Sequence, residues 1–158
     1  MIEKIISGGQ TGADEAGLHA AFELGIKTGG SAPKGWRITH PDGTDGSNPQ
    51  LGSVFGLVEH THRNYQKRTI QNVLDSDGTA LFGYTDSPGA KLALRTCIEH
   101  RKPYIINPSS QKLADWVNNY TIKILNVAGN RQSDLNPDIY QNTYQVVYNA
   151  LKLLLVSK

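Results

Sequence analysis

The sequence lacks the features that would place it outside the cell or within a membrane. Its 158 residues include one cysteine, so no disulfide can form within the chain. It has no apolar run long enough to cross a bilayer and no signal sequence at its start. We therefore expect a cytoplasmic protein with no membrane partner.

Charge is also scarce. Charged residues make up 19% of the chain, the net charge is +2, and no block of basic residues occurs. This balance argues against a nucleic-acid partner and is compatible with an anionic small molecule. With 38% hydrophobic residues the chain is globular rather than disordered, and its length suits one domain with its own core.

Several common catalytic motifs are missing as well. No G-x-S-x-G nucleophile motif is present. His60 and His62 have a metal-like spacing but no evident third ligand nearby, so no metal site is predicted. Cys97 shares a helical face with small apolar residues and is expected to be a buried hydrophobe. The sequence indicates a binding site more clearly than a catalyst, and no catalytic residue is predicted.

Strand and helix patterns alternate along the chain, which predicts an α/β fold with a parallel sheet and helices on both faces. The apolar runs predict strands over 2–6, 26–30, 79–84, 104–107 and 122–127. The helical patterns cover 13–24, 64–74, 88–100, 111–119 and 137–156.

The stretch 31–62 is the least regular part, with prolines and glycines recurring through it. A loop of this length inside a compact domain is usually functional or disordered, so we expect a flexible, lid-like loop. Its first residues, 32–37, should lie over the carboxyl end of the second strand. Lys34 would then reach a bound anion, whereas Arg37 is equally well explained as a solvated charge.

A glycine-rich turn, 7–14, joins the first strand to the first helix. Free N–H groups and the positive end of the helix dipole make such a turn suitable for an anion, most often a phosphate. It matches neither G-x-G-x-x-G nor the P-loop, because the spacing differs and no Lys follows the last glycine. The alternative is a turn that only lets the helix pack closely on its strand. The candidate ligand residues are Gly8, Gly9, Gln10, Thr11 and Gly12.

Two further polar turns follow predicted strands. In the first, Ser87 is a helix N-cap and Pro88 suits the first helical position, which is also ordinary helix-start chemistry. In the second, Arg131 offers a planar fork of donors suited to phosphate, although a surface ion pair is the usual role. Turns on neighbouring strands surround one crevice, which suits a ligand with a phosphate and a second polar end. The candidates are Ser87, Gly89, Ala90, Lys91, Asn130, Arg131 and Ser133.

Two helices carry surfaces whose use the sequence leaves open. Arg68, Thr69 and Asn72 form a polar stripe that faces a ligand, a neighbouring subunit or solvent. At the end of the last helix, 153–156 widens the apolar surface beyond one stripe. Core packing would explain this, but we expect a homo-oligomer, a dimer or tetramer, that uses this end.

Together, the turn 7–14, the Pro-Lys-Gly step 33–35, the segment 68–77 and the stretch 126–129 resemble the molybdenum carrier family. These molybdenum cofactor carrier proteins are grouped with the circularly permuted members of the SLOG superfamily. The resemblance covers nearly the whole chain in order. It implies a single Rossmann-like domain over 1–158, often assembled as a homo-oligomer. It also implies binding of molybdenum cofactor, molybdopterin that carries a phosphate and a dithiolene holding the metal.

The resemblance further implies which residues hold the cofactor. The turn 8–12 would bind its phosphate, and 87–91 stands where the family has a Gly-Thr-rich phosphate-binding helix start, here without the Thr. Lys34 and 130–133 would complete the polar rim. Such a protein binds, protects and delivers the cofactor to acceptor molybdoenzymes, or exchanges it with cofactor-synthesis proteins, without catalysis. On this hypothesis Gly9→Asp weakens binding and leaves the fold intact.

The alternative is an enzyme. Other branches of the superfamily hydrolyse nucleoside monophosphates, with a Glu that follows their glycine-rich turn. No equivalently placed Glu follows the turn 87–91, so Asp14, Glu15 or Asp86 would have to act instead. A third possibility is a nucleotide-binding module that senses its ligand without turnover.

Overall fold

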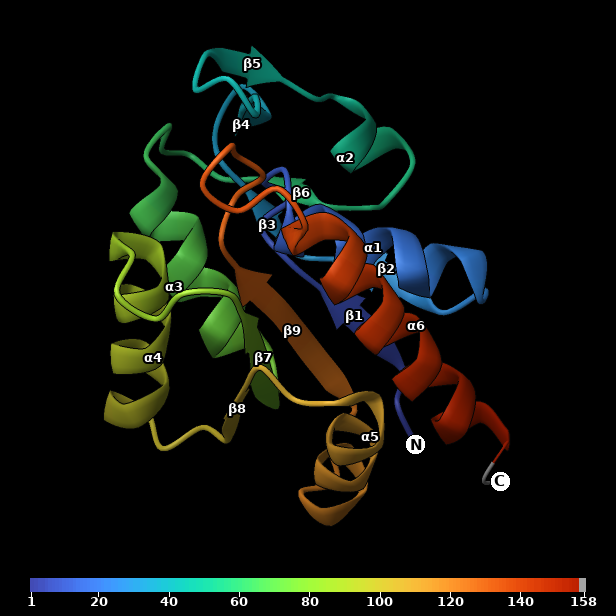
Figure 1. Cartoon of the computed structure of the whole chain (residues 1–158). Helices are drawn as coiled ribbons and strands as arrows, with labels where there is room; N and C mark the ends of the chain where they lie inside the picture. Colours follow the sequence, from blue (N-terminus) through green and yellow to red (C-terminus); the bar gives the residue numbers. More distant parts are fainter. Residues whose placement is uncertain (157–158) are drawn as a thin grey trace.

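A computed structural model describes residues 1–156 and contains one central sheet of five parallel strands. Along the sheet the strand order is β2–β1–β9–β7–β8, and every neighbouring pair is parallel (Figure 1). The predicted α/β fold with a parallel sheet is confirmed. In chain order the strands are β1 (Lys4–Ile6), β2 (Lys27–Gly29), β7 (Gly78–Phe82), β8 (Tyr104–Ile106) and β9 (Ile124–Gly129).

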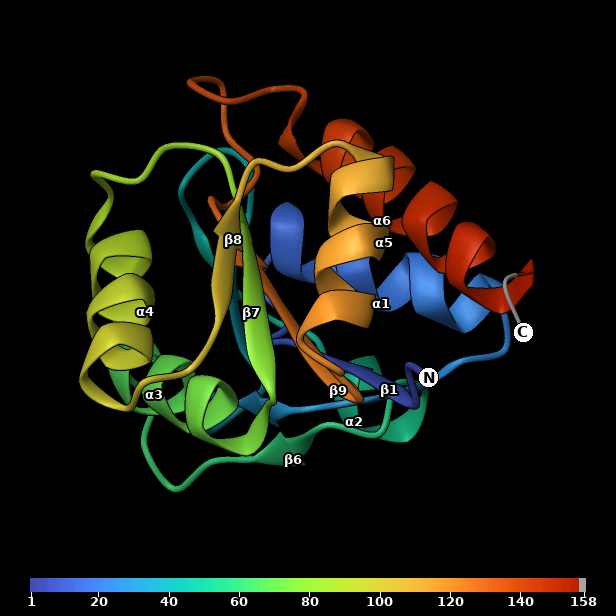
Figure 2. The same cartoon turned by 90° about the horizontal axis from the view of Figure 1, so that it is seen from below.

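Helices cover both faces of this sheet, as predicted for a Rossmann-like fold. Figures 1 and 2 show α1, α5 and α6 on one face and α3 and α4 on the other. No helix formed by residues 1–156 is both long and apolar enough to cross a membrane. The bounds are α1 (Ala13–Glu23), α3 (Tyr65–Asp75), α4 (Pro88–Glu99), α5 (Ser110–Asn119) and α6 (Ile139–Val156).

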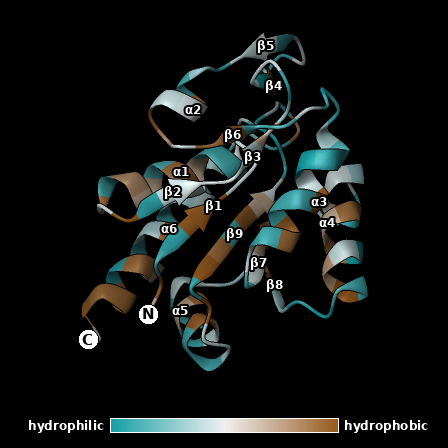
Figure 3. Cartoon of the chain, turned by 180° about the vertical axis from the view of Figure 1, so that it is seen from behind, coloured by the Kyte–Doolittle hydropathy of each residue, from teal (hydrophilic) through white to brown (hydrophobic). Residues whose placement is uncertain are grey.

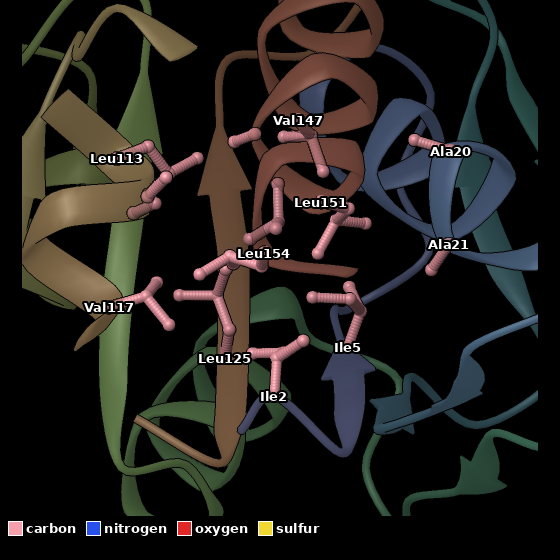
Figure 4. Packing of buried hydrophobic residues seen from close by; sticks show 14 of the residues in the cluster. Ile2, Ile5, Ala20, Ala21, Leu113, Val117, Leu125, Val147, Leu151 and Leu154 are labelled. Carbon is pink, nitrogen blue, oxygen red and sulfur yellow. The ribbon is translucent and has the colours of Figure 1, made fainter. Parts of the chain in front are cut away.

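The main core lies between the sheet and the face formed by α1, α5 and α6. Figure 4 shows Ile5 and Leu125 of the sheet packed against Val147 and Leu151 of α6. On the opposite face, Leu81 of β7 packs with residues of α3 and α4. Both faces are therefore buried, and Figure 3 shows β1 and β9 in hydrophobic colours. This is the expected composition of a parallel sheet covered on two sides.

The strand order explains why this chain does not begin like other doubly wound proteins. Numbered from β7 onward, as β7, β8, β9, β1, β2, the sheet reads 2-1-3-4-5, a common doubly wound order. The chain begins instead at the fourth of these strands. Consistent with such a permutation, the end of α6 lies near the N-terminus in Figures 1 and 2. The topological switch point of this order lies between β7 and β9.

The stretch 31–62 contains regular structure where the sequence predicted an irregular loop. It forms a small core of its own, in which Ile38, Leu51 and Leu57 pack against Leu18 of α1. Its strands are two or three residues long, too short to produce a periodic pattern. They are β3 (Ser31–Ala32), parallel to β6 (Val58–Glu59), and β4 (Arg37–Thr39), antiparallel to β5 (Asp45–Ser47), with α2 (Gln50–Ser53) between β5 and β6.

Candidate functional site

A cavity of about 820 Å³ lies at the carboxyl ends of β7 and β9. Residues of α3, the start of α4 and β4 complete its walls. This is the switch point of the sheet, where doubly wound proteins bind their ligands. The cavity is thus centred one strand away from β1 and the glycine-rich turn that follows it.

The charged residues in the wall of this cavity are mostly cationic. Arginines outnumber the carboxylates that line it, and the helix dipole of α4 adds positive potential at its N-terminus. Such a wall favours an anionic ligand, because guanidinium groups bind phosphate through paired hydrogen bonds. The charged lining residues are Arg37, Arg68, Arg95, Arg131, Asp14 and Asp86.

Most N–H groups of the glycine-rich turn have acceptors within the protein. All of its residues, 7–14, are buried. The N–H groups of Gly8 and Gln10 donate to the carboxylate of Asp14, the latter at 3.4 Å. The N–H of Thr11 donates to the side-chain oxygen of Gln10 at 3.0 Å. A carboxylate of the protein itself therefore occupies the position that the sequence assigned to a phosphate.

The glycines of this turn serve close packing between segments, which is the alternative that the sequence left open. Gly9 has φ +75°, and a Cβ there would lie 2.6 Å from a methyl group of Leu51. At Gly12 a Cβ would lie 2.5 Å from the backbone nitrogen of Gln132. We therefore no longer expect Gly9→Asp to leave the fold intact, because the new side chain would meet Leu51 of α2 and Gly9 has a positive φ that strains other residues.

Asp14 and Arg68 form a buried ion pair at the inner end of the cavity. Arg68 Nη1 lies 3.3 Å from Asp14 Oδ2, and their side chains are 11% and 4% exposed. Burial raises the pKa of Asp14, and the Arg68 charge and the backbone donors only partly oppose this effect. The guanidinium lies over Gly8, where a Cβ would be 2.2 Å from Nη1. Within residues 1–156, the buried Nε of Arg68 has no hydrogen-bond acceptor.

Tyr65 organises the wall next to this pair. The guanidinium groups of Arg37 and Arg68 lie 4.6 and 5.3 Å from the centroid of its ring. Its hydroxyl lies 2.8 Å from Thr39 Oγ1, and the Thr39 N–H donates to the side-chain oxygen of Gln10 at 2.7 Å. These contacts fix β4 over the cavity and hold two arginines beside each other.

The start of α4 offers few free donors. The Ser87 hydroxyl oxygen accepts from the N–H of Ala90 at 3.3 Å, which confirms its N-cap role. Pro88 has no N–H, so the N–H of Gly89 is left as the free donor of this first turn. The Asn130 amide donates to the same Ser87 oxygen at 3.2 Å.

Asn130 acts as a bridge between the turns after β7 and β9. Its Oδ1 accepts from the N–H of Tyr84 at 2.5 Å, and its Nδ2 donates to the Tyr84 carbonyl at 3.0 Å. It also accepts from the Asn136 side chain at 3.1 Å. Its side chain therefore positions the cavity wall and has little capacity left for a ligand.

The structure brings together only part of the predicted set. Lys34 and Lys91 are exposed, and neither lines the cavity. Sequence reasoning did not select Tyr65, named Asp86 only for the enzyme alternative, and left Arg68 undecided, although the polar stripe on α3 was the signal for Arg68. Of the predicted residues, those lining the cavity are Gln10, Ser87, Gly89, Ala90, Asn130, Arg131 and Ser133; Gly8, Gly9, Thr11 and Gly12 lie outside its lining.

Two other candidates are placed by the structure. Cys97 is buried, as predicted, and burial raises the pKa of its thiol. The rings of His60 and His62 lie 5.5 Å apart. In the part of the chain that the structure describes, no group of three or more His, Cys, Asp or Glu side chains is arranged to hold a metal ion.

Comparison with known proteins shows similarity to a sequence family and to a solved structure. The sequence model of the circularly permutated YpsA SLOG family matches residues 5–151. The crystal structure of a protein named putative molybdenum carrier protein, from Syntrophus aciditrophicus SB, superposes with a TM-score of 0.78. Its sequence is 34% identical, and the alignment covers 98% of this chain and 95% of that chain. No curated protein matches the chain.

Proposed function

The chain belongs to the circularly permutated YpsA SLOG family, and from this premise we propose that it is a carrier of molybdenum cofactor, held in the cavity between β7 and β9. The similar structure from Syntrophus aciditrophicus is named a molybdenum carrier, which supports this cargo. The observation that carries the proposal is the arginine-lined cavity at the switch point, with the unpartnered Nε of Arg68 beside it.

The residues of the cavity fit the chemistry of this cargo. A volume of about 820 Å³ lies within the range of small-molecule sites. Arg37, Arg68 and Arg131 would bind the phosphate, and Arg68 has a donor to spare. The N–H of Gly89 adds a donor at the start of α4. The phosphate is thus assigned to the arginine side chains and not to the turn 8–12.

A carrier needs burial and release rather than a chemical step. Asp14, Glu15 and Asp86 were the alternative carboxylates for an enzyme. Glu15 does not line the cavity, and Asp14 is already engaged by Arg68 and two N–H groups. Asp86 lines the cavity, but one carboxylate with no positioned partner does not make a hydrolytic site. We propose that acceptor molybdoenzymes or cofactor-synthesis proteins exchange the cargo with this chain.

The first test is retention of the cofactor. The protein is incubated anaerobically with molybdenum cofactor, passed through a gel-filtration column, and oxidised to release the fluorescent pterin. We expect pterin in the protein peak, and about tenfold weaker binding in Arg131→Gln, because one charged hydrogen-bond donor to the phosphate is lost. Lys34→Gln and Lys91→Gln are matched controls, since each removes one positive charge outside the cavity.

The control variants distinguish binding within the cavity from a general effect of the net charge of the protein. Equal weakening in all three variants would contradict the assigned cavity, because only the net charge would then matter. A protein peak without pterin would contradict the carrier proposal. The same samples would then be assayed for release of ribose phosphate from nucleoside monophosphates, where turnover abolished by Asp14→Asn would establish the enzyme alternative.

We also propose a homo-oligomer that uses the end of α6. Leu153 and Val156 are 38% and 80% exposed, and Figure 3 shows hydrophobic colours reaching the last turn of this helix. Light scattering at micromolar concentration should give a multiple of the 17.3 kDa chain mass. Leu153→Asp should reduce that mass, because a carboxylate would be desolvated at the contact. A monomeric mass for the unmodified protein would contradict the proposal.

A further inference from the structure

A continuous row of aromatic rings crosses the surface of α1 and α6, away from the arginine-lined cavity. The ring centroids of Phe55 and His19 lie 5.3 Å apart, and those of His19 and Tyr140 lie 5.6 Å apart. Tyr140, Tyr144 and Tyr148 then continue at 6.1 and 5.6 Å. A spacing of four residues places the three tyrosines on one face of α6. The rings are stacked, with interplanar angles of 19° and 16°.

The row borders a groove of about 390 Å³ between α1 and α6, two helices that lie side by side in Figures 1 and 2. Phe22, at its edge, is 53% exposed, an unusual position for a ring that has a core available nearby. No residue of this groove lines the arginine-lined cavity. The groove is formed by His19, Phe22, Glu23, Tyr140, Gln141 and Tyr144.

Hydrogen bonds hold the rings in place without a ligand. His19 Nδ1 lies 2.6 Å from the hydroxyl of Tyr140. The Tyr144 hydroxyl donates to the carboxylate of Glu23, and this bond raises the pKa of Tyr144 to about 12. A surface with fixed side chains loses little conformational entropy when a partner binds. The groove is therefore preorganised.

The charge of the groove is opposite to that of the chain. Glu23 carries a formal negative charge in the groove at neutral pH. Burial raises the pKa of Tyr140, and the nearby carboxylates of Glu15 and Glu23 raise this pKa further. The whole chain carries +2. The faces of the tyrosine rings add negative potential. At the far end, Nζ of Lys152 lies 5.7 Å from the centroid of Tyr148, so a cation of the chain already occupies the last ring.

We propose that this groove docks a basic segment of a partner protein, with an Arg or Lys side chain over Tyr140 and Tyr144 and its charged head at Glu23. Cation–π contacts and one ion pair would bind such a side chain, in the same manner as Lys152 binds Tyr148. The N–H of Tyr140 donates to the side chain of Gln132 at 3.1 Å, next to the cavity residue Arg131. This hydrogen bond connects the start of α6 to the segment that carries Arg131.

The test uses a fluorescent peptide that alternates glycine with arginine, and the same peptide with citrulline in place of arginine. Citrulline keeps the shape of the side chain and removes its charge. We expect the arginine peptide to bind and the citrulline peptide to bind at least tenfold more weakly. Tyr144→Leu and Glu23→Gln should each weaken binding of the arginine peptide about tenfold, whereas Tyr144→Phe, which keeps the ring and frees the carboxylate, should not.

Three outcomes would overturn the proposal. Equal binding of the two peptides would exclude recognition of the cation. Unchanged binding in Tyr144→Leu and Glu23→Gln, with unchanged circular dichroism, would place the peptide elsewhere. If light scattering shows that these two variants dissociate an oligomer, the groove is instead occupied by a second copy of the chain. Retention of the cofactor by Tyr144→Leu, measured separately, keeps the result independent of the carrier proposal.

Discussion

Arg68→Met is expected to lower the free energy of unfolding by about 3 kcal/mol at pH 8, because it leaves the carboxylate of Asp14 buried and without its counter-ion. Methionine retains the length of the side chain and most of its packing over Gly8. The loss therefore reports the charge and not a cavity. Urea denaturation followed by circular dichroism measures it.

The loss should become smaller as the pH falls. The pKa of Asp14 in the folded protein is raised, so the folded state binds a proton more readily than the unfolded state, and stability declines as the pH rises through this pKa. Removal of Arg68, which opposes the shift, raises the folded-state pKa further. As the pH falls, Asp14 is therefore protonated more readily in the variant, and less charge is buried without a partner.

A double variant provides the control. Asp14→Asn in the Arg68→Met background removes the stranded charge and keeps an oxygen that can accept from the N–H groups of Gly8 and Gln10. It should recover most of the lost stability at pH 8. An equal loss at pH 5 and pH 8, or a double variant no more stable than Arg68→Met, would show that the pair does not carry this energy.

The sheet and its helices could be predicted because long elements leave strong patterns. Every strand of the central sheet and each of its covering helices follows an apolar run or a helical stripe, and the bounds differ by one or two residues at most of their ends. The strand order could not be predicted, because no sequence pattern records which strands are neighbours. Without that order, the turn after β1 was predicted to bind the phosphate, although the switch point of the sheet lies between β7 and β9.

In the candidate site, too, the sequence did not predict which single residues are brought together in space. Lys34 and Arg37 are three positions apart in one turn-rich stretch, and only the pairing of β4 with β5 decides which faces the cavity. The glycines of the turn 7–14 have the same sequence signature whether they admit a ligand or another segment. Here they admit Leu51, Arg68 and the backbone at 130–132.

The contact between these two turns explains why Gly12→Ala should be the most damaging small substitution in the site. Gly12 has φ +95°, and a Cβ would meet the backbone of Gln132 at 2.5 Å and the Asn130 oxygen at 2.6 Å. Backbone hydrogen bonds join the same segments, from Ala13 to Asn130 at 3.1 Å and from Gln132 to Thr11 at 3.2 Å. Strain and steric clash together should lower the free energy of unfolding by about 4 kcal/mol.

Substitutions at two other glycines distinguish the effect of backbone strain from that of steric clash. Gly25 has φ +71°, and a Cβ there would have no atom within 4 Å, so Gly25→Ala should cost about 1 kcal/mol from backbone strain alone. Gly89 has helical backbone and open space, so Gly89→Ala should be neutral or stabilise by about 0.5 kcal/mol. Urea denaturation should show the largest loss of stability for Gly12→Ala, a smaller loss for Gly25→Ala and none for Gly89→Ala. If Gly12→Ala is insoluble while the two control variants fold, this result also supports the prediction. If Gly12→Ala costs no more than Gly25→Ala, the turns after β1 and β9 can separate freely. Arg131 would then be held in the cavity wall by its own bonds to the carbonyls of His40 and Gln132.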